Sequence, residues 1–247
     1  MLRTADVTVR FGAHVALDRV ELSFARGSVH AVIGPNGAGK TTLFNVLSGE
    51  LRPTEGTVVF DERDVTRLDA TSRSHLGLAR SFQRTNVFPK LTVFENVRLA
   101  AQSRTRRSFA LWQRATSLDD VNARTETVLR EFGLLGDRAH LAGELAGGDQ
   151  RLLELAITVA TDPVLLLLDE PSQGLSSQDA WRLIDRISEL ASQYTIVLIE
   201  HNMPLVMKVA DVITVLNYGR VLAAGAPDEI RANPTVQEAY LGKRAPR

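Results

Sequence analysis

The side chains best suited to chemistry begin with a glycine-rich stretch and the residues directly after it: Gly34, Pro35, Asn36, Gly37, Ala38, Gly39, Lys40, Thr41 and Thr42. Glycines let consecutive backbone N–H groups turn toward one anion, and a helix that starts near Lys40 points the positive end of its dipole at the same place. The Lys40 ammonium would reach the β- and γ-phosphates, and the Thr41 hydroxyl would bind Mg²⁺. The spacing therefore predicts a phosphate-binding loop. The alternative, an ordinary glycine-rich turn, is disfavoured by the strand that precedes this stretch.

Two adjacent carboxylates follow an apolar run at residues 164–168. Because ligands of α/β proteins bind at the carboxyl ends of the strands, Asp169 and Glu170 would emerge beside the phosphate-binding loop. Asp169 would hold Mg²⁺ through water, and Glu170 would orient or deprotonate the water that attacks the γ-phosphate. An ordinary strand end is the alternative for this pair taken alone, and the nearby loop favours the catalytic interpretation.

Two further polar side chains carry weaker signals. His201 follows an apolar run at residues 194–199 and the acidic Glu200, so it would lie at the same sheet edge and contact the γ-phosphate. Gln83 precedes the middle of the chain, where its amide would touch Mg²⁺ or the attacking water; a plain surface glutamine is the alternative. The remaining histidines are interpreted as structural or solvated: His14, His30, His75 and His140.

The elements that must position these residues follow from hydrophobic patterning. Alternating or apolar runs predict strands over residues 6–11, 20–24, 29–33, 57–60, 164–168, 194–199, 212–216 and 219–223. Helices are predicted over residues 40–47, 179–191 and 227–241. Strands that alternate with helices imply a parallel sheet covered by helices, and the strand-poor middle of the chain is predicted to be a mostly helical insertion.

The composition is that of an ordinary globular chain of 247 residues, 44% apolar and 23% charged. The chain has 29 lysines and arginines and 29 aspartates and glutamates, so its net charge is zero. Nucleic-acid-binding domains usually carry a strongly basic charge, and this composition shows none. The absence of cysteine excludes disulfides, thiolate metal sites and a cysteine nucleophile. Residues 164–168 fall far short of the roughly 20 apolar residues that span a membrane, and the first six residues lack a signal peptide's apolar block. We expect a cytosolic chain that reaches a membrane only by docking on another protein.

The stretch Leu145-Ala146-Gly147-Gly148-Asp149-Gln150-Arg151 closely precedes Asp169 and Glu170, and it resembles the signature of ATP-binding cassette (ABC) ATPases, usually Leu-Ser-Gly-Gly-Gln. A phosphate-binding loop, a signature and an Asp-Glu pair in this order make the resemblance cover essentially the whole chain. It implies an α/β fold: a P-loop (RecA-like) parallel sheet with an N-terminal antiparallel β subdomain. One domain would span residues 1–247, and a helical subdomain inserted at 84–161 would carry the signature.

The resemblance also implies how the chain works. ABC ATPases act as head-to-tail dimers, in which each ATP with its Mg²⁺ lies between the phosphate-binding loop of one subunit and the signature of the other. The signature residues would be Leu145, Ala146, Gly147 and Gly148. Phe11 resembles the aromatic residue that stacks on adenine, Gln83 the glutamine that couples the site to a membrane partner, and His201 the switch histidine.

Further segments narrow the resemblance to the ATP-binding subunits of branched-chain amino acid importers: Arg80-Ser81-Phe82-Gln83, Leu91-Thr92-Val93-Phe94-Glu95-Asn96-Val97 and Ile199-Glu200-His201-Asn202-Met203. Urea- or amide-import and lipopolysaccharide-export ATPases share parts of this pattern. The implied partners are integral membrane permeases, a second ATPase subunit and, indirectly, a solute-binding protein, at the cytoplasmic face of the membrane, with no nucleic acid. The alternative of another class is a soluble ABC-type ATPase, but such proteins usually carry coiled coils, two cassettes or basic arms, which this chain lacks.

The sequence departs from the family pattern at three places. Ala146 replaces the signature serine, Asp149 replaces the usual glutamine, and Ser176-Ser177 stands where many relatives have an aspartate after Leu175. The lost serine hydroxyl would remove one hydrogen bond to the γ-phosphate, worth roughly 1.5–3 kcal/mol. We hypothesise that this signature serves the weaker of two unequal ATP sites.

Overall fold

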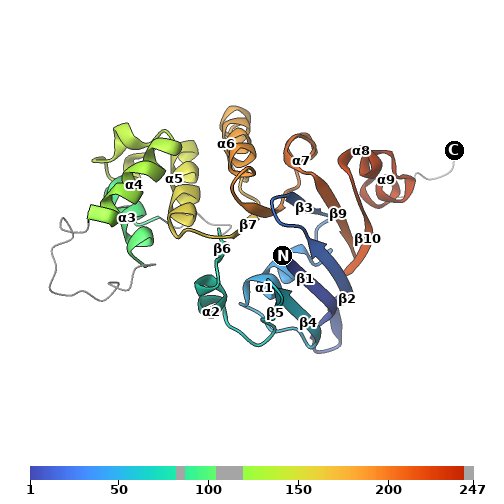
Figure 1. The fold of residues 1–247 in the computed structure, drawn as a ribbon. Coiled ribbons are helices and arrows are strands. Elements are labelled where there is room, and N and C mark those ends of the chain that lie inside the picture. Colours follow the sequence, from blue (N-terminus) through green and yellow to red (C-terminus); the bar gives the residue numbers. More distant parts are fainter. Residues whose placement is uncertain (82–86, 104–118, 242–247) are drawn as a thin grey trace.

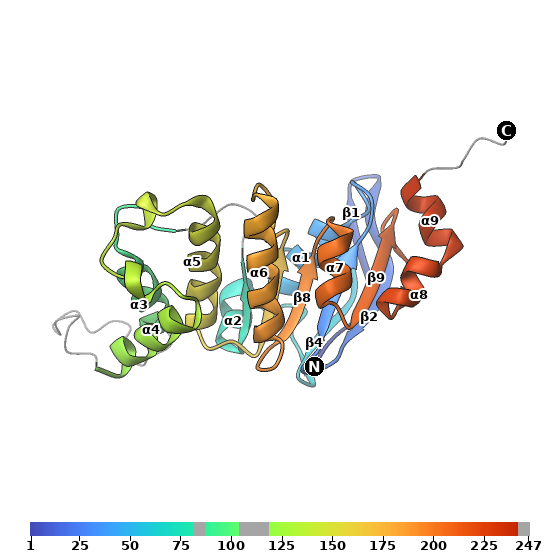
Figure 2. The ribbon, with the colours of Figure 1, turned by 90° about the horizontal axis from the view of Figure 1, so that it is seen from above.

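The computed structural model describes residues 1–81, 87–103 and 119–241. Two sheets enclose one helix between them, and further helices cover the other face of the larger sheet (Figures 1 and 2). The predicted α/β class with a parallel core sheet and an N-terminal antiparallel sheet is confirmed.

The smaller sheet is antiparallel and has the strand order β2-β1-β4-β5. Its strands are β1 (Leu2–Phe11), β2 (His14–Phe24), β4 (Glu55–Phe60) and β5 (Arg63–Asp64). The first two are longer than the predicted ranges 6–11 and 20–24. Bulges interrupt their pairing, and Asp6 and Arg19 there have positive φ angles of 52° and 48°. A bulge shifts which residues face the core, so a strict alternation of polar and apolar residues finds only part of each strand.

The larger sheet has the order β10-β9-β3-β8-β7-β6 and is parallel except for β10, which pairs antiparallel with β9. In this order the strands are Arg220–Gly225, Val212–Asn217, Val29–Ile33, Thr195–Ile199, Leu165–Asp169 and Leu78–Arg80. Every residue of the three central strands β3, β8 and β7 is buried, as expected for a parallel sheet covered on both faces.

Helix α1 (Lys40–Ser48) packs between the two sheets, where Leu43, Phe44 and Leu47 join one hydrophobic core. The helix ends where Gly49 adopts the left-handed conformation and donates its N–H to the Val46 carbonyl. Arg73 of α2 (Ala70–His75), fully buried, caps the same end, because its guanidinium donates to the carbonyls of Val46 and Leu47.

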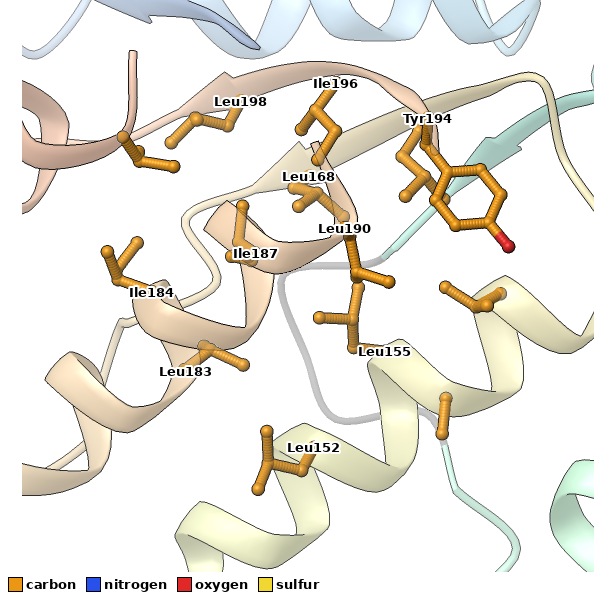
Figure 3. Packing of buried hydrophobic residues seen from close by; sticks show 14 of the residues in the cluster. Leu152, Leu155, Leu168, Leu183, Ile184, Ile187, Leu190, Tyr194, Ile196 and Leu198 are labelled. Atoms are coloured by element: carbon orange, nitrogen blue, oxygen red, sulfur yellow. The ribbon is translucent and has the colours of Figure 1, made fainter. Parts of the chain in front are cut away.

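The opposite face of the larger sheet is covered by α6 (Ser177–Leu190) and α7 (Met203–Val209). Figure 3 shows Leu183, Ile184 and Ile187 of α6 packed against Leu168 and Leu198 of the sheet. Leu152 and Leu155 of α5 (Gly147–Ala160) extend the same core toward the remaining helices.

Helices α3 (Val93–Ser103) and α4 (Asp119–Glu131) gather with α5 on one side of the sheets (Figures 1 and 2), joined by the short 3₁₀ turns Leu135–Asp137 and Ala142–Glu144. The helical subdomain at 84–161 stays a prediction, and residues 84–86 and 104–118 of that range lie outside the described residues. The chain ends in α8 (Pro227–Ala232) and α9 (Pro234–Leu241). The prediction of one helix over 227–241 is wrong, because Asn233 precedes a proline and is extended, with φ −74° and ψ 115°.

Candidate functional site

The predicted phosphate-binding loop joins β3 to α1, at the carboxyl end of the central strand of the larger sheet. Two of its glycines are required by close packing as well as by positive φ angles. A Cβ atom on Gly34 (φ 153°) would lie 2.2 Å from the Leu216 carbonyl oxygen, and one on Gly39 (φ 101°) would lie 2.7 Å from the Ala16 carbonyl oxygen. The loop is therefore held against β9 and β2 in a conformation that only glycine allows.

Lys40 is the first residue of α1 and is only 8% exposed. Its Nζ donates to the carbonyl oxygens of Gly34 at 2.7 Å and Pro35 at 3.1 Å, which holds the ammonium over the loop. Burial lowers the pKa of Lys40, and the negative charges of Glu170 and Asp169 oppose this shift. The ammonium thus lies in the field of the predicted catalytic carboxylate, Glu170, and of the predicted Mg²⁺-holding carboxylate, Asp169.

The remaining loop residues divide by exposure. Asn36 and Gly37 are exposed, and Ala38 is buried. In the first turn of α1 Thr41 is exposed and Thr42 is half-buried, and no acidic residue offsets the positive end of the helix dipole. The exposed Thr41 hydroxyl is accordingly the one that is free to meet a ligand of the loop.

Asp169 is the last residue of β7, and its carboxylate is 3% exposed. Arg80, at the end of the neighbouring strand β6, donates from Nη2 to Asp169 Oδ2 at 2.9 Å. Burial raises the pKa of Asp169, and the Arg80 guanidinium opposes that rise. An anionic oxygen ligand at this position suits a hard cation such as Mg²⁺.

Glu170 follows with φ 47°, a left-handed conformation that is uncommon for a residue with a side chain. Its N–H donates to the Ile199 carbonyl oxygen at 3.0 Å, which ties the end of β7 to the end of β8. His201, just beyond β8, brings its Nδ1 to 4.0 Å from Glu170 Oε1, and its side chain is 59% exposed. The structure therefore brings Glu170 and His201 together at one sheet edge, as predicted from sequence.

Glu200 is a site residue that the sequence analysis named without assigning it a role. It is completely buried, and its Oε1 accepts from the Ser172 N–H at 2.9 Å while Oε2 accepts from the His201 N–H at 3.1 Å. One carboxylate thus fastens the turn after Glu170 to the turn that carries His201. The sequence signal that could have identified this role of Glu200 is an acidic residue directly after a fully apolar strand.

Phe11 is the last residue of β1, pairs with His14 across the β1–β2 turn and is 53% exposed. The strand after this turn, β2, adjoins the phosphate-binding loop, because a Cβ atom on Gly39 would lie 2.7 Å from the carbonyl oxygen of Ala16 in β2. Phe11 is therefore an exposed aromatic residue near the loop, as a base-stacking residue needs to be. Gln83, predicted to sense the nucleotide, lies outside the described residues.

The signature lies on the helical side of the molecule. Leu145 is half-buried, whereas Ala146 and Gly147 are exposed, and Ala146 stands at the N-cap of α5 without a side-chain cap. A Cβ atom on Gly148 would lie 2.6 Å from Asp179 Oδ1 at the start of α6, so glycine allows the two helix ends to meet. Asp149 accepts a hydrogen bond from Arg182 of α6 at 2.7 Å. The aspartate that replaces the usual glutamine therefore pairs with a charged side chain of the neighbouring helix.

A groove of about 450 Å³ separates the sheet edge from the helical side. Its lining includes charged and polar side chains from several elements: Glu50, Thr71, His75, Arg80, Glu154 and Thr158. Arg80 belongs to both this groove and the carboxylate site, because Nη1 also lies 3.1 Å from Glu50 Oε2. Gln83 follows Arg80 by three positions in the sequence.

Comparisons with known proteins agree with this arrangement. The family model described as ABC transporter matches residues 17–173, and one described as branched-chain amino acid ATP-binding cassette transporter matches residues 220–246. The chain is 39% identical to the high-affinity branched-chain amino acid transport ATP-binding protein LivG of Salmonella typhimurium and 37% identical to BraF of Pseudomonas aeruginosa. Each comparison covers 98% of this chain and 98% of the relative.

Among solved structures, the ADP conformation of MJ1267, an ATP-binding cassette of an ABC transporter, superposes with a TM-score of 0.88 at 30% identity, over 98% of this chain and 99% of that one. A dimeric post-hydrolysis state of the cassette MJ0796 bound to ADP and Pi gives 0.78 at 26% identity, over 92% and 99%.

Proposed function

The chain belongs to the ABC transporter family of ATP-binding cassettes, and from this premise we propose that it powers the import of branched-chain amino acids. It is an ATPase of that family. The observation that carries the ATP-hydrolysing part of the proposal is the meeting of the phosphate-binding loop, Asp169, Glu170 and His201 at the carboxyl ends of the adjacent strands β3, β8 and β7.

The proposed chemistry assigns each residue a task that suits its place. Backbone N–H groups of the loop and the Lys40 ammonium bind the phosphates of ATP. Glu170 accepts a hydrogen bond from the attacking water, or its proton, and His201 contacts the γ-phosphate beside it. Phe11 stacks on adenine.

The proposed metal is Mg²⁺, which supplies charge neutralisation to the phosphates when it is bound. Thr41 and Asp169 would hold it, and the donor chemistry fits: both offer hard oxygens, and Mg²⁺ commonly takes one or two protein ligands together with phosphates and water. Gln83 completes the proposed set.

A second ATPase subunit is the first proposed partner. Ala146 and Gly147 are exposed at the start of α5, where their N–H groups can meet an anion on another subunit. Gly148 of the same turn would help to hold that γ-phosphate. Closure around ATP then follows from its higher affinity for the closed dimer, and loss of the γ-phosphate reopens it.

The second proposed partner is a pair of integral membrane permeases, which would hold the chain at the cytoplasmic face of the membrane. No helix among the described residues is long and apolar enough to cross a bilayer. The 450 Å³ groove beside Arg80 is the proposed docking place, since it adjoins both the helical side and the carboxylate site. A solute-binding protein would act only through the permeases.

The substrate assignment is supported by full-length similarity to LivG and BraF and by the C-terminal match at residues 220–246. Urea or amide import and lipopolysaccharide export are the alternatives within the family, and a soluble ATPase outside transport is the alternative of another class. Uptake of radiolabelled leucine and of urea in cells that carry only Glu170→Gln protein separates them. We expect leucine uptake to be lost and urea uptake to be unchanged. The reverse result, or no loss of either, would contradict the assignment.

A further inference from the structure

Arg80 ends the edge strand β6 and is only 9% exposed, although it is among the most polar side chains. β6 runs parallel to β7 with Arg80 opposite Leu167, two residues before Asp169. From there one terminal nitrogen, Nη2, donates to Asp169 Oδ2 at 2.9 Å. Only Oδ2 of the carboxylate takes part in this bond, and no hydrogen bond to Oδ1 is found among the described residues.

The other terminal nitrogen of Arg80 binds α1. Nη1 lies 2.8 Å from Asn45 Oδ1 and 3.0 Å from Ser48 Oγ, both on the last turns of that helix. Asn45 and Ser48 follow Thr41 by four and seven positions, and residues with these spacings share one face of an α-helix. Arg80 therefore rests on the helix face that presents the Thr41 hydroxyl one turn away.

We propose that Arg80 is a positioning residue for the magnesium site, because it ties the Asp169 carboxylate to the face of α1 that carries Thr41. This inference rests on the proposed function, which places Thr41, Gln83 and Asp169 around the ion, with Asp169 acting through water. Mg²⁺ demands near-ideal octahedral geometry, so the separation of groups that hold it from different elements must be kept closely. Residues that orient metal ligands typically change metal affinity by about 10–100-fold when replaced.

The competing explanation is a buried ion pair that only stabilises the fold. Removing one partner of a buried ion pair lowers stability in either case, because the other charge is left buried and unpaired. The two explanations differ in the magnesium requirement of nucleotide binding. Loss of a purely structural contact lowers the melting temperature without changing the Mg²⁺ concentration that gives half-maximal binding.

The first test is the double variant Asn45→Ala/Ser48→Ala in the full chain. It removes both hydrogen bonds of Arg80 to α1, leaves its contacts with the Phe44 ring and with Glu50, keeps every charge of the site and places good helix formers on the helix. Binding of a fluorescent ATP analogue is titrated with MgCl₂ and, separately, measured in EDTA. We expect the half-saturating Mg²⁺ concentration to rise about three- to ten-fold, while affinity in EDTA changes by less than about two-fold.

The second variant is Arg80→Lys, which keeps the positive charge but loses the fork that reaches both partners. It should raise the half-saturating Mg²⁺ concentration at least as much as the double variant. Arg124→Lys is the matched control, because this half-buried arginine of α4 contacts the Val159 carbonyl and Asp162 away from the site. Its magnesium titration should match that of the unmodified chain.

Unchanged magnesium titrations in either folded variant would overturn the inference, even if the melting temperature falls, and each variant decides the question if the other does not fold. The proposed function fails by a different result: an unmodified chain that binds no nucleotide, with or without Mg²⁺. An unmodified chain that binds normally beside variants that match it would refute the role of Arg80 alone.

Discussion

Glu200 offers a sharp test of how the site is held, through the variant Glu200→Gln. The glutamine keeps the shape of the side chain, but one of its two end atoms becomes an NH₂ group that cannot accept a hydrogen bond. The carboxylate is completely buried and accepts from the N–H groups of Ser172 at 2.9 Å and His201 at 3.1 Å. At least one of these N–H groups, of which the Ser172 group is buried and the His201 group partly buried, must therefore lose its acceptor.

The expected magnitude follows from the charge and burial of these bonds. A hydrogen bond to a charged group contributes about 1.5–3 kcal/mol, and a buried donor left without a partner costs about 1–3 kcal/mol. We expect the free energy of unfolding to fall by about 2–3 kcal/mol, which lowers the thermal midpoint of a chain of this size by about 4–12 °C. Because the same carboxylate holds the turn of His201, ATP turnover should fall by roughly ten-fold or more.

The assay pairs thermal unfolding with steady-state ATP hydrolysis and a nucleotide-binding titration. Glu189→Gln is the control, since Glu189 is an exposed residue of α6 whose side chain is 62% accessible. A substitution at such a place changes stability by less than about 0.5 kcal/mol. A Glu200→Gln chain that matches this control in both midpoint and turnover would refute the anchoring role of Glu200.

Three further perturbations test separate parts of the structure. Lys40→Met removes the buried ammonium that lies over the loop, so ATP hydrolysis should fall by more than about 100-fold, and unchanged activity would contradict the loop assignment. Burial lowers the pKa of His30 from 6.5 to about 4. Between these two pH values the unfolded state therefore binds the proton more tightly than the folded state does. The free energy of unfolding should therefore fall by up to about 3 kcal/mol as pH drops from about 6.5 to about 4. His30→Gln should remove that part of the slope, and an unaltered slope would exclude His30 as its source. Ala146→Ser supplies the missing cap of α5 and should raise stability by about 1 kcal/mol, measured by denaturant unfolding. A rise in ATP turnover of the assembled dimer would also support the weak-site hypothesis, and an unchanged rate would count against it.

Local signals explain most of what the sequence predicted correctly. The loop between residues 33 and 40 is marked in the sequence by three closely spaced glycines, a lysine and a threonine, and the flanking strand and helix are short and regular. Asp169 and Glu170 directly follow an apolar run, so their place at a sheet edge needed no knowledge of distant contacts. The break before Pro234 has an equally local cause, but the prediction of one helix over 227–241 missed it, although a residue before proline disfavours the helical conformation.

The parts that were not predicted depend on contacts between distant segments. Arg80 and Asp169 meet only because β6 pairs with β7, and Glu200 reaches Ser172 only because β8 pairs with β7. Strand order cannot be deduced from hydrophobic patterning, which gives the elements but not their neighbours. The bulges in β1 and β2 likewise arise from pairing between strands, so the alternation of residues alone shortened both.

The most direct measurement of ATP-driven closure and hydrolysis compares Glu170→Gln with the unmodified chain in the presence of ATP and Mg²⁺. Glu170 lies beside His201, and its negative charge acts on Lys40. The groups proposed to bind the phosphates, by contrast, belong to the loop and to α1. We predict that the variant binds ATP with nearly normal affinity, hydrolyses it at least about 100-fold more slowly and accumulates as an ATP-bound dimer in sedimentation. Near-normal hydrolysis by a folded variant would contradict the catalytic role of Glu170 and the site built around it.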